Sequence, residues 1–272
     1  MAGKKNVQKG YPDIIYTKEN HIATITMNRP DKMNAFTPEM SDSLYRAVED
    51  SASDDDIRVI IITGNGRAFC SGADVKAMAE RFKQPDSPAA MGQRRPDRVS
   101  LHLLMQKCLK PIIGAINGAA VGGGLDFACA CDIRIASDRA RFAEVFIRRG
   151  MLPAAGGTFF LPRLVGIDNA LLMAMTGDMV DAEEAKRIGL VTMVVPHDEL
   201  EIATLELAEK LANGPTLAIQ KTKQAIYEGL NMDLEETLKY IQGKMQELNK
   251  TRDHQEGATA FVEKREPEFR GE

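Results

Sequence analysis

The pattern of apolar and polar positions predicts short strands interleaved with helices. Small or apolar side chains alternate along residues 13–18 and 21–27, which predicts two strands joined by a tight turn. The unbroken apolar run at residues 58–63 is typical of a strand covered on both faces. Three more strands are predicted at residues 111–116, 132–136 and 190–195.

The helical pattern changes along the chain. Thr37 and Pro38 are typical of a helix start, so we expect a helix from there to about Ser51, and a buried helix at residues 124–131. After residue 200 almost everything has helical periodicity, in segments 198–211, 215–227, 234–249 and 253–264. We therefore predict a mixed α/β core at residues 1–200 and a helical region at residues 201–272, whose apolar faces must be buried on the core or on another subunit.

Composition narrows the class of protein. The 272 residues carry a net charge of −4, which argues against a nucleic-acid surface, and no apolar run has the length of a membrane span. Residues 1–9 are basic but are not followed by the apolar stretch of a signal peptide, so we expect a cytoplasmic protein. The four cysteines and four histidines have no metal-ligand spacing, so no metal site is expected.

Two glycine-containing loops are the candidates for chemistry. Gly122, Gly123 and Gly124 open the predicted helix at 124–131, where backbone N–H groups can approach an anion, and Asp126 follows two residues later. The alternative for this stretch is tight helix packing with a capped or solvated aspartate. The second loop, Ser71-Gly72-Ala73-Asp74, precedes a helix predicted at 74–82 and can also present N–H groups. Neither loop has the glycine spacing of a dinucleotide-binding or P-loop motif.

Several motifs in order along nearly the whole chain resemble the crotonase, or enoyl-CoA hydratase/isomerase, superfamily. They are Asn28-Arg29-Pro30 with Asn34-Ala35, Phe69 to Asp74, Asn117-Gly118 through Gly124, Cys131 to Arg134, Pro153 with Gly156-Gly157-Thr158, residues 182–189, and Glu263-Lys264-Arg265 with Pro267. The resemblance implies an α/β spiral of ββα units with a C-terminal helical trimerisation region. It also implies a homotrimer or a dimer of trimers acting on an acyl-CoA thioester, with coenzyme A as part of the substrate and no separate cofactor.

The resemblance assigns expected roles to individual residues. The N–H groups of Ala73 and Gly123 are expected to hold a thioester enolate, since paired donors stabilise a developing oxyanion. The expected coenzyme A contacts are Lys32, Ala35, Ser71, Asp74 and Val75, with Phe261 and Lys264 reaching the coenzyme A of a neighbouring subunit. The alternative for the lysines is a solvated surface charge.

The chain departs from the hydratase pattern at its acid/base positions. Typical hydratases of this superfamily carry two glutamates, and the corresponding residues here are Asp126 and Phe146, while a third position used by some isomerases is Ala154. Glu144 lies two residues before Phe146, so in an extended segment the two side chains would share a face and Glu144 could act from a displaced position. The alternative is an ion pair between Glu144 and Arg141 or Arg148.

Three functions follow from this departure. The first is hydration of an enoyl-CoA, with Asp126 as the main acid/base group and water or Glu144 assisting. The second is a double-bond isomerisation that uses Asp126 alone, and the third is acyl-CoA binding without catalysis. Met78, Phe82 and residues 80–100 are expected to shape the acyl pocket. Phe146 adds an apolar wall, which favours an apolar or cyclic acyl group.

Overall fold

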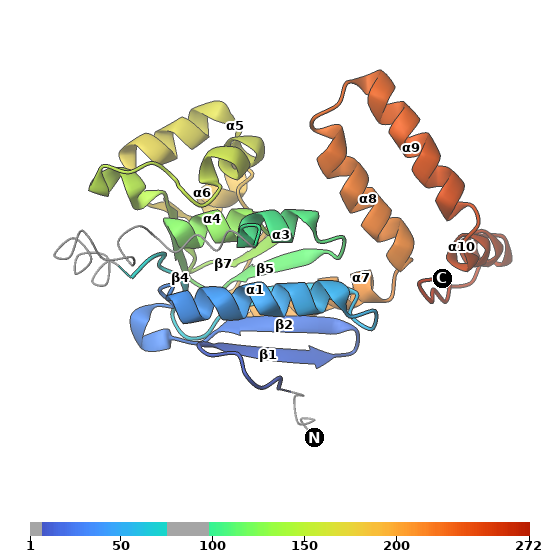
Figure 1. The fold of residues 1–272 in the computed structure, drawn as a ribbon, viewed down its shortest axis with the longest axis horizontal. Helices are drawn as coiled ribbons and strands as arrows, with labels where there is room; N and C mark the ends of the chain where they lie inside the picture. Colours follow the sequence, from blue (N-terminus) through green and yellow to red (C-terminus); the bar gives the residue numbers. More distant parts are fainter. Residues whose placement is uncertain (1–6, 75–97) are drawn as a thin grey trace.

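The computed structural model describes residues 7–74 and 98–272, and its centre is a six-stranded sheet (Figure 1). In the order in which they pair, the strands are β1 (Ile14–Glu19), β2 (Ile22–Met27), β3 (Val59–Gly64), β5 (Ile112–Ile116), β7 (Ile133–Ser137) and β10 (Met193–Val195). All neighbours except the antiparallel β1–β2 hairpin pair in parallel. Each predicted strand is present, with ends shifted by at most three residues.

A second, four-stranded sheet is built from the segments between these strands. Its order is β4 (Ala68–Cys70), β6 (Ala119–Val121), β8 (Arg141–Ala143) and β9 (Val180–Asp181). Along the chain, a strand of the large sheet is followed by one of the small sheet, as in β3–β4, β5–β6 and β7–β8. A helix follows the last two of these pairs. This repeat confirms the predicted spiral of ββα units.

The helices predicted within the described residues begin and end close to their predicted positions, whereas those at Leu101–Lys107, Gly157–Thr176 and Ala182–Arg187 were not predicted. The described helices are α1 (Pro38–Ser53), α3 (Leu101–Lys107), α4 (Gly123–Cys129), α5 (Gly157–Thr176), α6 (Ala182–Arg187), α7 (Leu200–Ala212), α8 (Thr216–Gly229), α9 (Leu234–Leu248) and α10 (Arg252–Glu263). Thr37 caps α1 by accepting a hydrogen bond from the Met40 N–H, as the Thr-Pro pair predicted. The helix predicted at 74–82 lies outside the described residues except for Asp74, as do Met78 and Phe82.

Hydrophobic residues fill both faces of the large sheet. The larger cluster lies between the sheet, α1, α4 and the start of α5, and the smaller one lies between the opposite face and α7. In the smaller cluster, Ile61, Ile113 and Ile135 pack with Leu200 and Ala208 of α7. The predicted boundary near residue 200 thus assigns α7 to the helical region, although this helix covers the sheet.

One described helix, α5, is long and apolar enough to cross a membrane by length and composition. No such segment was expected from the sequence. It contains Pro162 and breaks at Gly166, whose backbone is not helical. Phe160, Leu161 and Val165 are buried in the main core. These features are typical of a core-packing helix with an exposed apolar side.

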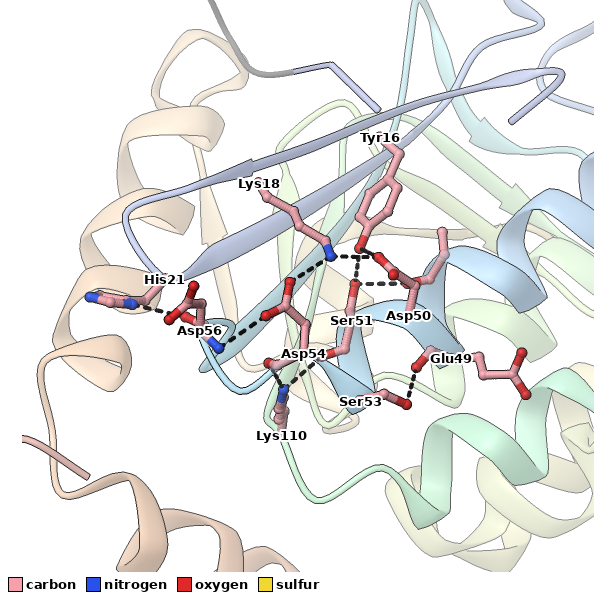
Figure 2. A network of polar contacts seen from close by, with 11 residues as sticks. Tyr16, Lys18, His21, Glu49, Asp50, Ser51, Ser53, Asp54, Asp56 and Lys110 are labelled. Carbon is pink, nitrogen blue, oxygen red and sulfur yellow. Dashed lines mark hydrogen bonds and ion pairs between the residues drawn. The ribbon is translucent and has the colours of Figure 1, made fainter. Parts of the chain in front are cut away.

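A polar network fastens the edge strand β1 to the end of α1 (Figure 2). The Tyr16 hydroxyl donates to Asp50 at 2.6 Å, and the Lys18 ammonium lies 2.6 Å from both Asp50 and Asp54. Lys110 is buried and donates to the carbonyl oxygens of Ser51 and Asp54 at 2.7 and 2.5 Å. Burial lowers the pKa of Lys110. The network satisfies the last turn of α1 just before β3 begins.

Helices α8 and α9 form a hairpin that stands away from the sheets, with α10 beyond it (Figure 1). The hairpin is attached through Asp132, which accepts from the Ile112 N–H, from Lys223 at 2.6 Å and from the Tyr227 hydroxyl at 2.9 Å. Large apolar side chains on the hairpin remain exposed, among them Ile226, Leu230, Leu234 and Leu238.

We predict that Asp132→Asn lowers the free energy of unfolding by about 3 kcal/mol, because it leaves the buried Lys223 ammonium without its carboxylate. Chemical denaturation of the full chain measures the change. Lys239→Met, which removes an exposed ion pair with Glu235, is the matched control and should change stability by less than about 0.5 kcal/mol. Equal effects of the two substitutions would contradict this account of how α8 is held.

Candidate functional site

Two glycine-containing loops meet at the start of α4. A Cβ added to Gly72, whose φ is +83°, would stand 3.1 Å from the backbone nitrogen of Gly123 and 2.7 Å from the Val121 carbonyl oxygen. A Cβ on Gly124 would collide with the Cys70 carbonyl group. Only glycine permits this approach, and it places the two loops singled out from the sequence side by side.

The approach brings together the two expected oxyanion donors. Gly123 is the first residue of α4, so its N–H has no acceptor inside that helix. Ala73 directly follows Gly72 and is exposed. Within the described chain, neither N–H donates to a backbone group in a turn, loop or cap. Both donors are thus available to an external acceptor.

Asp126 lies in the first turn of α4 and is fully buried. Its Oδ2 accepts a hydrogen bond from the Ala155 N–H at 3.0 Å, while Oδ1 has no partner in the described part of the chain. Burial raises the pKa of this carboxyl group. The alternative of a solvated aspartate is therefore wrong.

Glu144 lies beside Asp126 and is also fully buried. A Cβ on Gly157 would collide with Oδ1 of Asp126 and would stand 3.0 Å from Oε1 of Glu144, so both carboxyl groups face the same glycine. Neither oxygen of Glu144 accepts a hydrogen bond from an N–H or hydroxyl group among residues 7–74 and 98–272, and the carboxyl group of Glu144 instead hydrogen-bonds that of Asp126. Burial, followed by repulsion from Asp126, raises the pKa of Glu144 to about 9.

The structure corrects two expectations about this segment. Glu144 does not pair with arginine: Arg141 donates to backbone carbonyl groups of Asp138 and Ala140, and Arg148 lies 3.7 Å from Asp178. The segment is also not extended, because Val145–Arg149 forms a 3₁₀ helix that Glu144 precedes. Glu144 therefore points inward, while the ring of Phe146 lies 3.7 Å from where a Cβ of Gly122 would stand.

The expected coenzyme A residues fall into two groups. Lys32, Ala35, Ser71 and Asp74 lie on adjoining loops, joined by hydrogen bonds from the Ser71 N–H to the Met33 carbonyl and from the Phe36 N–H to the Gly72 carbonyl. Ala35 is buried and Lys32 is exposed. Val75 lies outside the described residues.

Phe261 and Lys264 are not brought to these loops within one chain. They lie at the end of α10, well away from α4 in Figure 1. The ring of Phe261 is 86% exposed. Their expected role toward a neighbouring subunit stays a prediction.

Three residues near the carboxyl pair were missed by sequence reasoning. Gly157, the first residue of α5, packs against the pair, and the Ala155 N–H holds Asp126. His102 of α3 lies nearby, with its Cβ 3.9 Å from where a Cβ of Gly156 would stand. The Gly156-Gly157 pair was a visible signal. A single histidine in an apolar segment offered none.

Comparison with known proteins agrees with this geometry. A model of the family described as enoyl-CoA hydratase/isomerase matches residues 17–272. The chain belongs to this family. It is 41% identical to (E)-benzylidenesuccinyl-CoA hydratase of Thauera aromatica, over 93% of this chain and 96% of the relative.

The chain is also similar to other enoyl-CoA hydratases, in sequence and in structure. The chain is 36% identical to 2,3-dehydroadipyl-CoA hydratase of Escherichia coli (strain K12), over 95% of this chain and 99% of the relative. The solved structure of an enoyl-CoA hydratase from Bacillus anthracis superposes with a TM-score of 0.85 at 34% identity, covering 98% of this chain and all of that one. The coverage extends through both sheets and the C-terminal helices.

The raised pKa of Glu144 predicts how stability depends on pH. In the unfolded chain the pKa of a glutamate is about 4.3, whereas the pKa of the native Glu144 carboxyl group is raised to about 9. Between these values the native state binds more protons, so wild-type stability falls as pH rises, by up to about 1.4 kcal/mol per pH unit.

Glu144→Gln should remove most of that slope, so the variant gains stability relative to the wild type from pH 5 to pH 9. Denaturation across this range measures the difference, with the exposed Glu235→Gln as control. Parallel pH profiles for the wild type and Glu144→Gln would show that Glu144 ionises normally.

Proposed function

We propose that this chain adds water across the double bond of a 2-enoyl-CoA, using Asp126 and Glu144 as a pair of acid/base groups. The observation that carries the proposal is the burial of both carboxyl groups against Gly157, next to the helix turn that contains Gly123. Family membership and the hydratase names of both relatives support the addition of water to a CoA thioester.

The backbone supplies the electrostatic part of the mechanism. The N–H groups of Ala73 and Gly123 donate to the thioester oxygen, whose negative charge grows as the enolate forms. Because the glycine contacts fix both loops, these donors need little reorganisation during the reaction. One donor of this kind typically stabilises a transition state by about 3 kcal/mol.

The carboxyl pair supplies the proton transfers. At neutral pH burial, followed by repulsion between the two groups, keeps one proton on the pair. The ionised group removes a proton from water as the water oxygen bonds to the β-carbon. The protonated group delivers its proton to the α-carbon as the enolate collapses. The pair ends with one proton, and the substrate has gained one water molecule.

Pairing Glu144 with Asp126 explains how the chain could hydrate a substrate with Phe146 at the usual position of the second glutamate. The acid/base group missing at that position is supplied two residues earlier by Glu144, which the 3₁₀ helix directs inward. A second carboxyl group favours hydration over the isomerisation that Asp126 alone would perform. Its burial and raised pKa also favour catalysis over acyl-CoA binding without turnover.

The remaining roles complete the proposal. Lys32, Ala35, Ser71, Asp74 and Val75 line the coenzyme A path, and no cofactor besides the substrate takes part. The exposed apolar side chains on α8 and α9 support assembly into a homotrimer or a dimer of trimers. In that assembly, Phe261 and Lys264 reach the coenzyme A of a neighbouring subunit. The four free cysteines support a reducing, cytoplasmic location.

Purified protein incubated with crotonyl-CoA should give a product heavier by one water molecule in mass spectrometry. An unchanged mass with a new retention time would indicate isomerisation instead. Binding without any product would favour the non-catalytic alternative.

We predict that Asp126→Asn and Glu144→Gln each lower kcat by about a hundredfold or more, since each removes a proton-transfer group. The Kd for butyryl-CoA, a saturated analogue, should change by less than about threefold, and Glu235→Gln should match the wild type in both measurements. Full activity of Glu144→Gln would refute the role of the pair.

A further inference from the structure

Unpartnered buried polar atoms gather around one loop. In the described part of the chain, seven buried side-chain nitrogen or oxygen atoms lack a hydrogen-bond partner, and four of them belong to Asp126, Glu144 and His102. All three residues adjoin Gly156 or Gly157. The shared proton supplies a partner within the carboxyl pair, so Nε2 of His102 is the atom at this loop that a polar ligand would complete.

His102 is the member that the proposed mechanism leaves unused. Its Nε2 is inaccessible to solvent, whereas the residue as a whole is partly exposed. Burial lowers the pKa of the imidazole to about 4, so the ring is neutral at physiological pH. A neutral imidazole carries one N–H and one bare nitrogen, and it can bond to a hydroxyl, carbonyl or carboxylate oxygen.

The surroundings of His102 connect it to the proposed site. Its ring meets that of Phe127 edge-on, with centroids 6.1 Å apart. Phe127 in turn contacts Phe36, whose ring carbon lies 3.8 Å from where a Cβ of Gly123 would stand. These aromatic contacts run from the expected oxyanion donor through the fully buried Phe127 to His102, and His102 is the only one of the three residues with a hydrogen-bonding side chain.

We infer that His102 is a specificity residue of the acyl site, where Nε2 hydrogen-bonds an oxygen atom carried by the acyl chain. The inference rests on the proposed acyl-CoA site. It refines the expected preference for an apolar acyl group, because a single polar atom beside apolar side chains selects chains that carry an oxygen.

Calorimetric binding of saturated thioesters tests the inference without requiring turnover. The probes are hexanoyl-CoA, 6-hydroxyhexanoyl-CoA and adipoyl-CoA, which share a six-carbon acyl chain and differ in the terminal group. We expect the wild type to bind at least one oxygenated probe about tenfold more tightly than hexanoyl-CoA. The preferred probe then identifies the oxygen as hydroxyl or carboxylate.

His102→Leu should abolish this preference while changing hexanoyl-CoA affinity by less than about threefold. His102→Gln, which keeps a hydrogen-bonding group, should retain part of it, and the exposed His254→Leu should behave as wild type. Absence of a preference in the wild type, or its survival in His102→Leu, overturns the inference.

The wild-type comparison needs no variant, so the test holds even if His102→Leu does not fold. Its failure is also distinct from failure of the proposed function. Hydration of crotonyl-CoA without any probe preference overturns only the role of His102. A His102-dependent preference without hydration overturns only the reaction.

Discussion

The burial of two carboxyl groups side by side, with no cation against them in the described part of the chain, is the constraint on which the site depends. Asp126 and Glu144 are both inaccessible to solvent, and the arginines that flank Glu144 in the sequence turn to other partners. Two buried negative charges in such an environment repel strongly, so the pair holds a proton. The shared burial of Asp126 and Glu144 destabilises the native state at high pH, and it also places a protonated and an ionised carboxyl group side by side.

The backbone makes this arrangement possible. Gly157 leaves space for both carboxyl groups, the Ala155 N–H fixes one oxygen of Asp126, and the 3₁₀ turn after Glu144 directs it inward. The close contact of Gly72 with Gly123 fixes the donors for the thioester oxygen relative to the same helix. Stability is secured elsewhere, by packing on both faces of the large sheet and by polar networks that fasten α1 and α8. The site can therefore retain unsatisfied atoms that serve a substrate.

Much of the fold was predictable because its signals are local. Alternating or unbroken apolar runs located the six strands of the large sheet, and Thr37 with Pro38 located the start of α1. The short strands of the small sheet were not predicted as a sheet, since three-residue segments such as β6 have little periodicity. In the site, Asp126 followed from the glycine run beside it. The partnership of Glu144 with Asp126 depends on packing between segments 18 residues apart, so the sequence could not decide between an arginine pair and a displaced acid/base group. His102 could be found only from the missing partner of its Nε2.

The most direct test of the central claim is infrared spectroscopy of the ligand-free protein across neutral pH. The account predicts the carbonyl stretch of a protonated carboxylic acid at pH 7, a band that fades only as the solution becomes alkaline and that Glu144→Gln abolishes. Absence of this band in the wild type at neutral pH would mean that both groups are ionised. That result would contradict a shared proton and the mechanism built on it.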